Sequence, residues 1–229
     1  MKKVSFNLNG LNFEALHEKQ NTTKTVLFAT GSGGNPERHL PLLEFLSVSG
    51  FTVIAPYFER IVSPTPGLNE LSNRSSILSL AANLVEDTNA QLVGVGHSIG
   101  ATLLVGLAGG KIWLNESETV QSVVDDRIKR LVLFAPPTGF FQAPDSLTDV
   151  KAPIQVWYGS NDKITSPQQV EMLKSGLSKS SSIESRVIEG AGHFSFMNTL
   201  PPTIVDSLEN RSTFLSNLQT EVVGFATKN

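Results

Sequence analysis

Short apolar runs recur along this chain, and stretches with helical spacing separate them. The runs are rich in β-branched residues and span residues 25–30, 51–56, 91–96, 130–136 and 153–159, and a more polar strand is expected at 184–190. Patterns typical of helices lie at about 37–49, 71–85, 101–110 and 167–178, with a last one within about 201–220. Strands that alternate with helices form a mostly parallel sheet with helices on both faces. The expected fold class is therefore α/β.

The beginning of the chain follows a different pattern. Polar and apolar residues alternate over residues 4–8 and again over 11–15, and Asn9-Gly10 lies between the two stretches. An Asn-Gly pair between alternating segments is typical of a two-residue hairpin turn. We therefore expect an N-terminal antiparallel hairpin ahead of the α/β part. The polar segment that precedes residue 130 is expected to be partly helical.

Composition and charge exclude several classes of function. The 229 residues include no cysteine, which excludes disulfides, cysteine-ligated zinc and a cysteine nucleophile. A net charge of −3 leaves no basic footprint for nucleic acid or anionic lipid. The N-terminus has no continuous apolar segment of the secretory type, and no apolar run of about 20 residues is present to span a membrane. We expect one cytoplasmic domain over residues 1–229, with its oligomeric state left open.

A serine between glycines lies where a predicted strand gives way to a helical pattern. Residues 96–100, GHSIG, fit G-x-S-x-G with Ser98 at the centre. Glycine on both sides relieves crowding at a sharp strand-to-helix turn, and the free N–H groups at a helix start favour negative charge. A capping serine in a tight turn is the alternative. The functional interpretation makes Ser98 a nucleophile and the N–H of Ile99 an oxyanion donor.

A hydroxyl nucleophile needs a base, and the base needs an acid that orients it. Of the four histidines, His193 lies in a glycine-flanked loop after the last predicted strand, from which its ring can reach other strand ends. His97 adjoins the serine but points away from it in such a turn. His17 belongs to the hairpin and His39 to the first helix. We therefore predict His193 as the base, with a surface loop histidine as the alternative.

The predicted acid is Asp162, in the stretch YGSNDKITSP. It follows the strand at 153–159, at the carboxyl edge where open α/β sheets gather their functional loops. Asp145 and Asp149 follow the preceding strand and remain alternative candidates for the acid. Asp162 could also be a turn or helix-cap residue without a catalytic role. The order serine, aspartate, histidine, each after a strand, favours Asp162.

A glycine-rich loop, TGSGG at residues 30–34, follows the first predicted parallel strand. Its glycines allow the backbone to approach a bound carbonyl, so the N–H of Ser32 or Gly33 is expected as the second oxyanion donor. A phosphate cradle is the alternative. The loop lacks both the G-x-x-x-x-G-K-[ST] and the G-x-G-x-x-G spacing, which argues against nucleotide binding.

The stretches GHSIGA, YGSNDKI, GAGHFSF and TGSGG together resemble those of an α/β-hydrolase fold serine hydrolase. The chain is most similar in pattern to the small dienelactone-hydrolase-like and acetylhydrolase-like esterases, over nearly its whole length. The resemblance implies an α/β-hydrolase fold with a minimal cap or none, since only a short segment lies between residues 134 and 154. Two departures stand out. Dienelactone hydrolases have a cysteine where this chain has Ser98, and many relatives have a histidine where it has Thr30.

The resemblance implies acyl transfer on a small-molecule ester. Ser98 would attack the carbonyl, His193 would accept its proton and Asp162 would hold the imidazole. No cofactor, metal or nucleic-acid partner is implied. Thioesterase, lactonase, amidase and cofactor-free perhydrolase chemistry on the same triad remain alternatives, as does a non-catalytic binding scaffold.

Side chains near the expected loops are candidates for contacts with the substrate. An apolar pocket would draw on four aromatic residues, for which core positions are the alternative: Phe58, Phe140, Phe141 and Phe194. Arg38, His39 and Arg60 lie in the same regions of the chain. They could bind a substrate carboxylate or form a solvated surface, and the second role is favoured.

Overall fold

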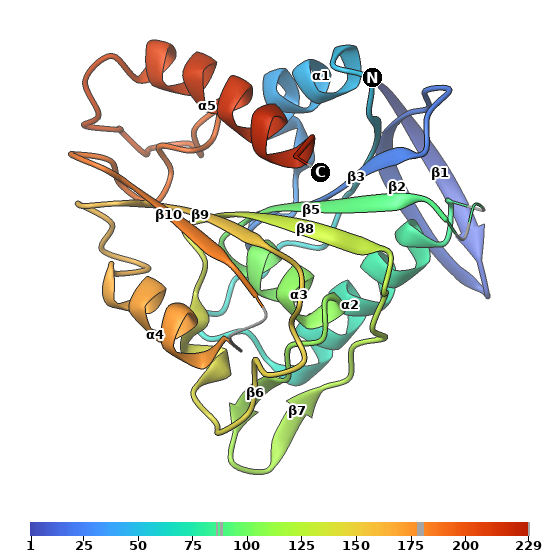
Figure 1. The fold of residues 1–229 in the computed structure, drawn as a ribbon, viewed down its shortest axis with the longest axis horizontal. Coiled ribbons are helices and arrows are strands. Elements are labelled where there is room, and N and C mark those ends of the chain that lie inside the picture. Colours follow the sequence, from blue (N-terminus) through green and yellow to red (C-terminus); the bar gives the residue numbers. More distant parts are fainter. Residues whose placement is uncertain (86, 88, 178–180, 229) are drawn as a thin grey trace.

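A mixed β-sheet runs through the molecule and separates two layers of helices (Figure 1). The computed structural model describes residues 1–85, 87, 89–177 and 181–228, and within these residues the sheet has eight strands. In sheet order they are β1 (Lys2–Leu8), β2 (Leu11–Glu18), β4 (Thr52–Pro56), β3 (Lys24–Ala29), β5 (Gln91–His97), β8 (Ile128–Phe134), β9 (Ile154–Gly159) and β10 (Ile183–Ile188). The order reverses beside β3, which lies between β4 and β5, and such switch points are where open α/β sheets bind ligands.

The first two strands form the expected hairpin. Both turn residues have positive φ, 52° at Asn9 and 80° at Gly10, as a type I′ turn requires. Strand β2 then pairs antiparallel with β4, and the other pairs in this sheet are parallel. The prediction of a mostly parallel α/β sheet with an N-terminal antiparallel hairpin is confirmed.

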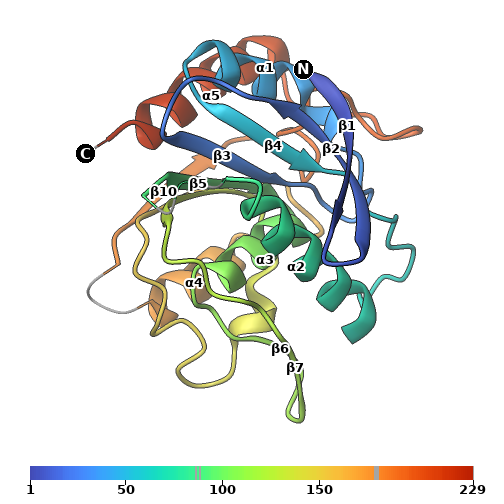
Figure 2. The ribbon, with the colours of Figure 1, turned by 90° about the vertical axis from the view of Figure 1, so that its right-hand side faces the viewer.

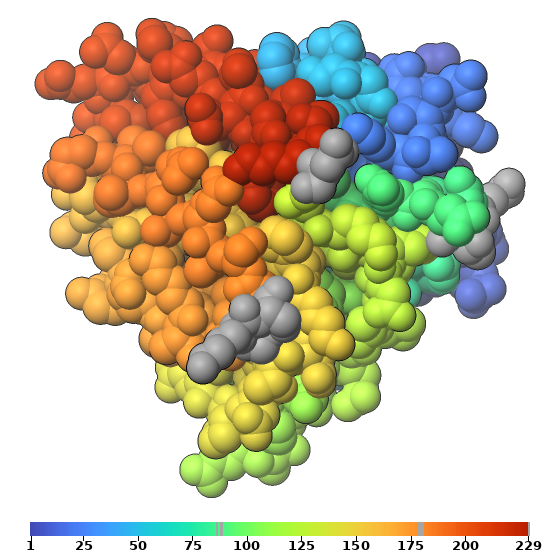
Figure 3. Space-filling view, viewed as in Figure 1, coloured from blue at the N-terminus to red at the C-terminus, as the bar shows by residue number. Residues whose placement is uncertain are grey.

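Helices cover both faces of the sheet (Figure 2). One layer contains α1 (Leu40–Val48) and α5 (Arg211–Ala226), and the other contains α2 (Leu68–Ala82), α3 (Ile99–Leu107) and α4 (Gln168–Gly176). In the space-filling view the red C-terminal segment meets the light-blue segment of α1 (Figure 3). Strands β3, β4 and β5 are buried almost throughout, as parallel strands covered on both faces must be. Among the helices described here, none is long and apolar enough to cross a bilayer.

Some expected elements differ from the observed ones. The polar segment ahead of β8 forms a small hairpin, β6 (Ile112–Asn115) and β7 (Glu118–Val120), instead of a partial helix. The side-chain oxygen of Asn115 accepts hydrogen bonds from the N–H and the hydroxyl of Ser117. These bonds stabilise the turn between β6 and β7. The last helix begins at Arg211, because Asn210 before it adopts a left-handed conformation with φ of 53° and ψ of 32°.

Smaller differences concern helix ends. A 3₁₀ helix at Pro36–His39 precedes α1, and α4 is described to Gly176, so residue 178 of the predicted helix lies outside the described residues. Between β8 and β9 the described chain contains one short 3₁₀ helix, Thr138–Phe141, in place of a helical cap.

The topology brings four loops to one edge of the sheet. Strands β3 and β5 are paired in register up to Ala29 and Gly96, so the glycine-rich loop and the serine turn leave the sheet side by side. Strands β9 and β10 are likewise paired. Their following loops carry Asp162 and His193. The carboxyl ends of parallel strands thus bring Ser98, Asp162, His193 and the glycine-rich loop to one edge.

Candidate active site

Ser98 sits at a strained turn between β5 and α3. Its φ of 53° and ψ of −131° lie in a region that residues with a Cβ rarely adopt. The turn is held by a hydrogen bond of 2.8 Å from the N–H of Ser98 to the carbonyl of Phe134. It also requires glycine at position 100, where a Cβ would lie 2.3 Å from the carbonyl oxygen of Ala29. The helix start can approach β3 this closely only because Gly100 has no side chain.

The three residues predicted as a triad lie in one hydrogen-bonded chain. Nε2 of His193 is 2.9 Å from Oγ of Ser98, and Nδ1 of the same ring is 2.9 Å from Oδ2 of Asp162. His193 and Asp162 are buried, whereas Ser98 is partly accessible from the cavity above it. The competing aspartates lie elsewhere: Asp149 pairs with Lys111 at 3.7 Å, and Asp145 lines a separate hollow.

The carboxylate of Asp162 is fixed by more than the histidine. Its Oδ1 accepts the N–H groups of Ile164 and Thr165, each at 2.8 Å, and its Oδ2 accepts the hydroxyl of Thr165 at 2.7 Å. Burial by itself would raise the pKa of Asp162. The hydrogen bonds from His193 and Thr165 outweigh burial and hold this pKa below its ordinary value. The group therefore stays ionised and keeps the proton of the imidazole on Nδ1.

Three backbone N–H groups are available beside the serine hydroxyl. Ile99 is the first residue of α3, so its N–H has no partner within the helix. In the described part of the chain, the N–H groups of Ser32 and Gly33 donate no hydrogen bond either. A Cβ built on Gly31 would lie 3.1 Å from Cβ of Ser98, so the glycine-rich loop passes directly over the serine. These are the N–H groups that the sequence suggests as oxyanion donors.

Two further histidines are buried behind the triad. Nε2 of His97 lies 2.9 Å from the carbonyl oxygen of His193, and the two rings are 5.0 Å apart. His39 lies next to His97, with 5.4 Å between the ring centroids. Burial, followed by the charges of His193 and His39, lowers the pKa of His97 well below its ordinary value. His97 therefore stays neutral and donates its Nε2–H to the loop that carries the base.

The cavity above Ser98 has a volume of about 720 Å³. Its wall includes apolar side chains, basic side chains and the glycine-rich loop, among them Ile61, Ile164, Phe194, Met197, Arg38 and Arg60. Phe194 is thus at the pocket as expected. Phe58 and Phe141 are buried in the core instead, and Phe140 packs against that core, because these side chains face α2, α3 and α4. His39 is also buried rather than exposed to the cavity.

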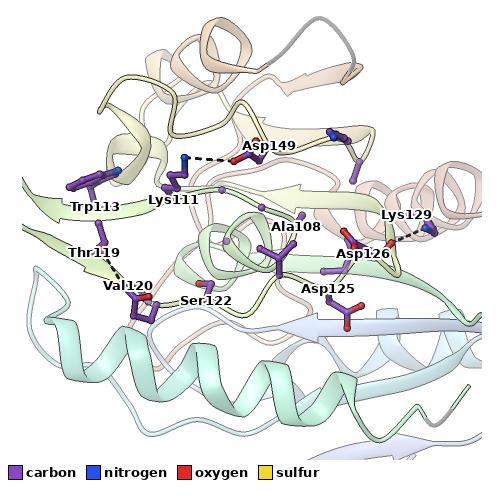
Figure 4. A pocket seen from close by; sticks show the side chains of 18 of the residues that line it. Ala108, Lys111, Trp113, Thr119, Val120, Ser122, Asp125, Asp126, Lys129 and Asp149 are labelled. Carbon is purple, nitrogen blue, oxygen red and sulfur yellow. Dashed lines mark hydrogen bonds and ion pairs between the residues drawn. The ribbon is translucent and has the colours of Figure 1, made fainter. Parts of the chain in front are cut away.

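A larger cavity of about 970 Å³ lies at the opposite edge of the sheet, near the amino ends of β8 and β9 (Figure 4). Its labelled side chains include Trp113 from the small hairpin and the ion pair between Lys111 and Asp149. No histidine is among the described residues that line it. Ser98 and His193 line the smaller cavity. Over the described residues, no group of three histidine or acidic side chains is arranged to hold a metal ion.

Solved structures of similar architecture are numerous. A putative α/β hydrolase from Agrobacterium tumefaciens is 18% identical with a TM-score of 0.64, over 98% of this chain and 94% of that one. An esterase from Pyrococcus furiosus is 17% identical with a TM-score of 0.65, over 98% and 90%. A monoacylglycerol lipase from Paleococcus ferrophilus is 15% identical with a TM-score of 0.65, over 94% and 98%. The chain has the α/β-hydrolase fold. No protein-family model and no curated protein matches the sequence.

The supporting contacts of three residues in this α/β-hydrolase fold protein were not predicted from the sequence. Thr165 supports Asp162, His97 supports the His193 loop, and Arg74 of α2 binds the glycine-rich loop. The Asp-x-x-Thr spacing at 162–165 is a local signal for a side chain that accepts backbone N–H groups. No comparable signal marks Arg74, because Gly31 and Ser32 lie 43 and 42 residues before it in the sequence.

Proposed function

We propose that this protein is a serine hydrolase that cleaves small or medium carboxylic esters through an acyl-enzyme. The observation that carries the proposal is the chain of two 2.9 Å hydrogen bonds from Ser98 through His193 to Asp162. A nucleophile, a base and an orienting acid in contact, beside free N–H groups, are the parts that acyl transfer needs. Neighbours of the same fold that are named as esterases or lipases add support.

Acylation begins with His193 neutral and protonated on Nδ1. As Oγ of Ser98 attacks the ester carbonyl, its proton passes to Nε2 of His193, and Asp162 stabilises the imidazolium that results. The carbonyl oxygen becomes an oxyanion. The N–H of Ile99 and an N–H of the Ser32–Gly33 segment donate to it. The imidazolium then protonates the departing alkoxide, which leaves as the alcohol.

Deacylation repeats these steps with water. His193 removes a proton from a water molecule, and the hydroxide formed attacks the acyl group on Ser98. A second oxyanion forms at the same N–H groups and collapses, breaking the bond between the acyl carbon and Oγ. The proton on Nε2 returns to Oγ, so the carboxylic acid is released and the triad is restored.

The walls of the cavity favour an ester with an apolar part of modest size. Phe194, Ile164 and Met197 supply apolar surface near Ser98. Ile164 is 60% exposed, so its side chain can be covered by a ligand. The segment between β8 and β9 adds only a short 3₁₀ helix in the described chain, which leaves room for varied alcohol groups.

A fluorophosphonate probe tests the proposal directly. Wild-type protein should be labelled at Ser98, and Ser98→Ala should remove both labelling and ester hydrolysis while the protein stays folded. Asp162→Asn should lower kcat by up to about 10⁴-fold, because the imidazole is then held in the wrong tautomer.

Nitrophenyl esters of increasing chain length, run beside thioesters, lactones and amides, identify the preferred acyl group. Labelling that persists in Ser98→Ala would refute the assignment of the nucleophile.

A further inference from the structure

We propose that Arg74 is a positioning residue for the oxyanion hole. Its guanidinium holds the carbonyl groups of Gly31 and Ser32 on one side of the glycine-rich loop. The N–H groups of Ser32 and Gly33 are thereby turned toward the reacting carbonyl on the other side. The inference rests on the proposed function, since it concerns how the same site stabilises the oxyanion.

The contacts of Arg74 are made with backbone carbonyls. Its Nη1 donates to the carbonyl oxygen of Gly31 at 2.9 Å, and its Nη2 donates to that of Ser32 at 2.9 Å and that of Glu59 at 2.5 Å. Arg74 is only 2% exposed, and its guanidinium carbon lies 5.0 Å from the centroid of the Phe58 ring. A rigid planar group thus bridges the glycine-rich loop and the segment after β4.

Peptide geometry links these carbonyls to the candidate donors. In a trans peptide the C=O and the following N–H point in opposite directions within one plane. The carbonyl of Gly31 shares a peptide with the N–H of Ser32, and the carbonyl of Ser32 shares one with the N–H of Gly33. When the guanidinium fixes both carbonyls, it also fixes the direction of both N–H groups. These are the groups that donate no hydrogen bond within the described chain.

The charge of Arg74 is unusual for a buried group. None of the ion pairs among the residues that the structure describes involves Arg74. The carboxylate of Glu70 instead accepts the N–H of Gly67 at the start of α2. Burial lowers the pKa of Arg74 to about 10, so the side chain remains a cation at neutral pH. A buried cation paired only with carbonyls is costly to maintain. Next to an oxyanion hole, however, the charge of Arg74 would favour the reaction. It would polarise the two peptides that carry the donor N–H groups and attract the negative charge that develops on the substrate oxygen.

The glycine-rich loop has other bonds that would hold its general shape. The carbonyl of Gly31 also accepts the N–H of Gly34 at 3.1 Å, and the carbonyl of Ser32 accepts the N–H of Ile61 at 2.9 Å. Loss of the guanidinium would therefore leave each carbonyl with one partner. We expect the loop to persist in such a variant while its N–H groups lose their exact direction and their polarisation.

Two substitutions and a matched control test this role. Arg74→Met keeps the length of the side chain without its charge, and Arg74→Lys keeps the charge without the bridging geometry. Arg127→Met is the control, because Arg127 also donates to backbone carbonyls, those of Val85 and Ala82, but binds Asp125 and lies near the opposite edge of the sheet. Melting temperatures establish that each variant is folded at the assay temperature.

We expect Arg74→Met to lower kcat by weakening stabilisation of the oxyanion alone. Removal of one oxyanion donor lowers kcat by about 10²–10³-fold, so a donor that is only misdirected in Arg74→Met should cost about 10–100-fold. Arg74→Lys should be intermediate, and Arg127→Met should keep wild-type turnover. KM and the pH midpoint of kcat/KM should not move, because the triad is untouched. A trifluoromethyl ketone, which forms a hemiketal oxyanion on Ser98, should bind more weakly by the factor that kcat/KM falls.

Equal losses of kcat/KM in Arg74→Met and Arg127→Met, or unchanged affinity for the ketone, would overturn the role of Arg74 in an active enzyme. If Arg74→Met does not fold, Arg74→Lys carries the test with the same two readouts. Wild-type protein that neither reacts with the fluorophosphonate nor hydrolyses any ester would overturn the proposed function, and the role of Arg74 with it.

Discussion

The hydroxyl of Thr165 lies 2.7 Å from Oδ2 of Asp162, the same oxygen that lies 2.9 Å from Nδ1 of His193. One carboxylate oxygen therefore receives both the threonine and the histidine. The other oxygen is held by two backbone N–H groups. Because both oxygens of the carboxylate are hydrogen-bonded, the Asp162 side chain is held in one orientation. It therefore fixes the orientation of the His193 ring, whose other nitrogen faces Ser98.

Replacement of Thr165 by valine should weaken this support. The variant keeps the shape of the side chain but loses a hydrogen bond to a buried charge, which costs about 1.5–3 kcal/mol of stability. We expect kcat to fall modestly with KM unchanged, and the pKa of Asp162 to rise. Thr165→Ser retains the hydroxyl and should keep most of the activity. The prediction fails if serine and valine at this position have the same effect on kcat.

His97 offers a second test of how the base is positioned. Its Nε2–H donates to the carbonyl of His193 at 2.9 Å, so the strand that carries the nucleophile is tied to the loop that carries the base. His97→Phe keeps a flat ring without the donor and should lower kcat, whereas His97→Gln can still donate and should retain more activity. KM should change little in either. Equal activity of the phenylalanine variant and the wild type would contradict this role.

The sheet and the three candidate triad residues could be predicted from the sequence because their signals are local. A buried parallel strand is a continuous apolar run. Ser98 and Asp162 each follow such a run, and His193 follows the more polar edge strand β10. Chain order and the rule that parallel strands end at one edge then bring the three together. The structure places them within hydrogen-bond distance of one another.

Features that depend on distant contacts were not accessible in this way. Whether Phe58 faces the cavity or the core depends on the packing of α2, which carries Arg74 against its ring. The hairpin of β6 and β7 has strands too short for a clear alternating pattern. The start of α5 at Arg211 depends on how the proline-containing segment before it turns, and Asn210 adopts a left-handed conformation there with φ of 53°.

Acid should begin to destabilise the fold at a pH above the range in which carboxylates ordinarily titrate. Burial and the charge of Arg38 lower the pKa of His39 to about 3, and His97 is also held neutral. Histidines of the unfolded chain take up protons at about pH 6.5. Between these values the unfolded state binds more protons, so stability is full above pH 6.5 and falls as the pH falls toward about 3. His39 contributes a slope of up to about 1.4 kcal/mol per pH unit.

Denaturant unfolding at a series of pH values from 7.5 downward measures this slope. His39→Phe removes the titrating group but keeps a flat ring beside Phe28, whose centroid lies 4.9 Å from that of His39. The variant should show a shallower dependence of the unfolding free energy on pH. An unchanged slope in His39→Phe would mean that other groups control the acid transition.

Gly100→Ala should separate the serine turn from the glycine-rich loop. The new Cβ would lie 2.3 Å from the carbonyl oxygen of Ala29 and 2.4 Å from that of Thr30. Both atoms belong to the backbone and cannot rotate away, so α3 must shift away from β3. We expect a loss of stability of about 1–3 kcal/mol or more and a loss of turnover, since the two sets of oxyanion donors move apart.

Gly224→Ala is the matched control for this substitution. Gly224 lies inside α5, and nothing lies within 4 Å of the position that its Cβ would take. Alanine there should raise stability by about 0.5–1 kcal/mol, because glycine is the poorer helix former, and should leave ester hydrolysis unchanged. A lower thermal stability of Gly100→Ala together with a higher thermal stability of Gly224→Ala would support this interpretation. The loss at position 100 would then come from the close approach of α3 to β3, and not from a general effect of replacing glycine by alanine. A Gly100→Ala protein as stable and active as the wild type would show that β3 and α3 can separate without cost, contrary to the close packing described above.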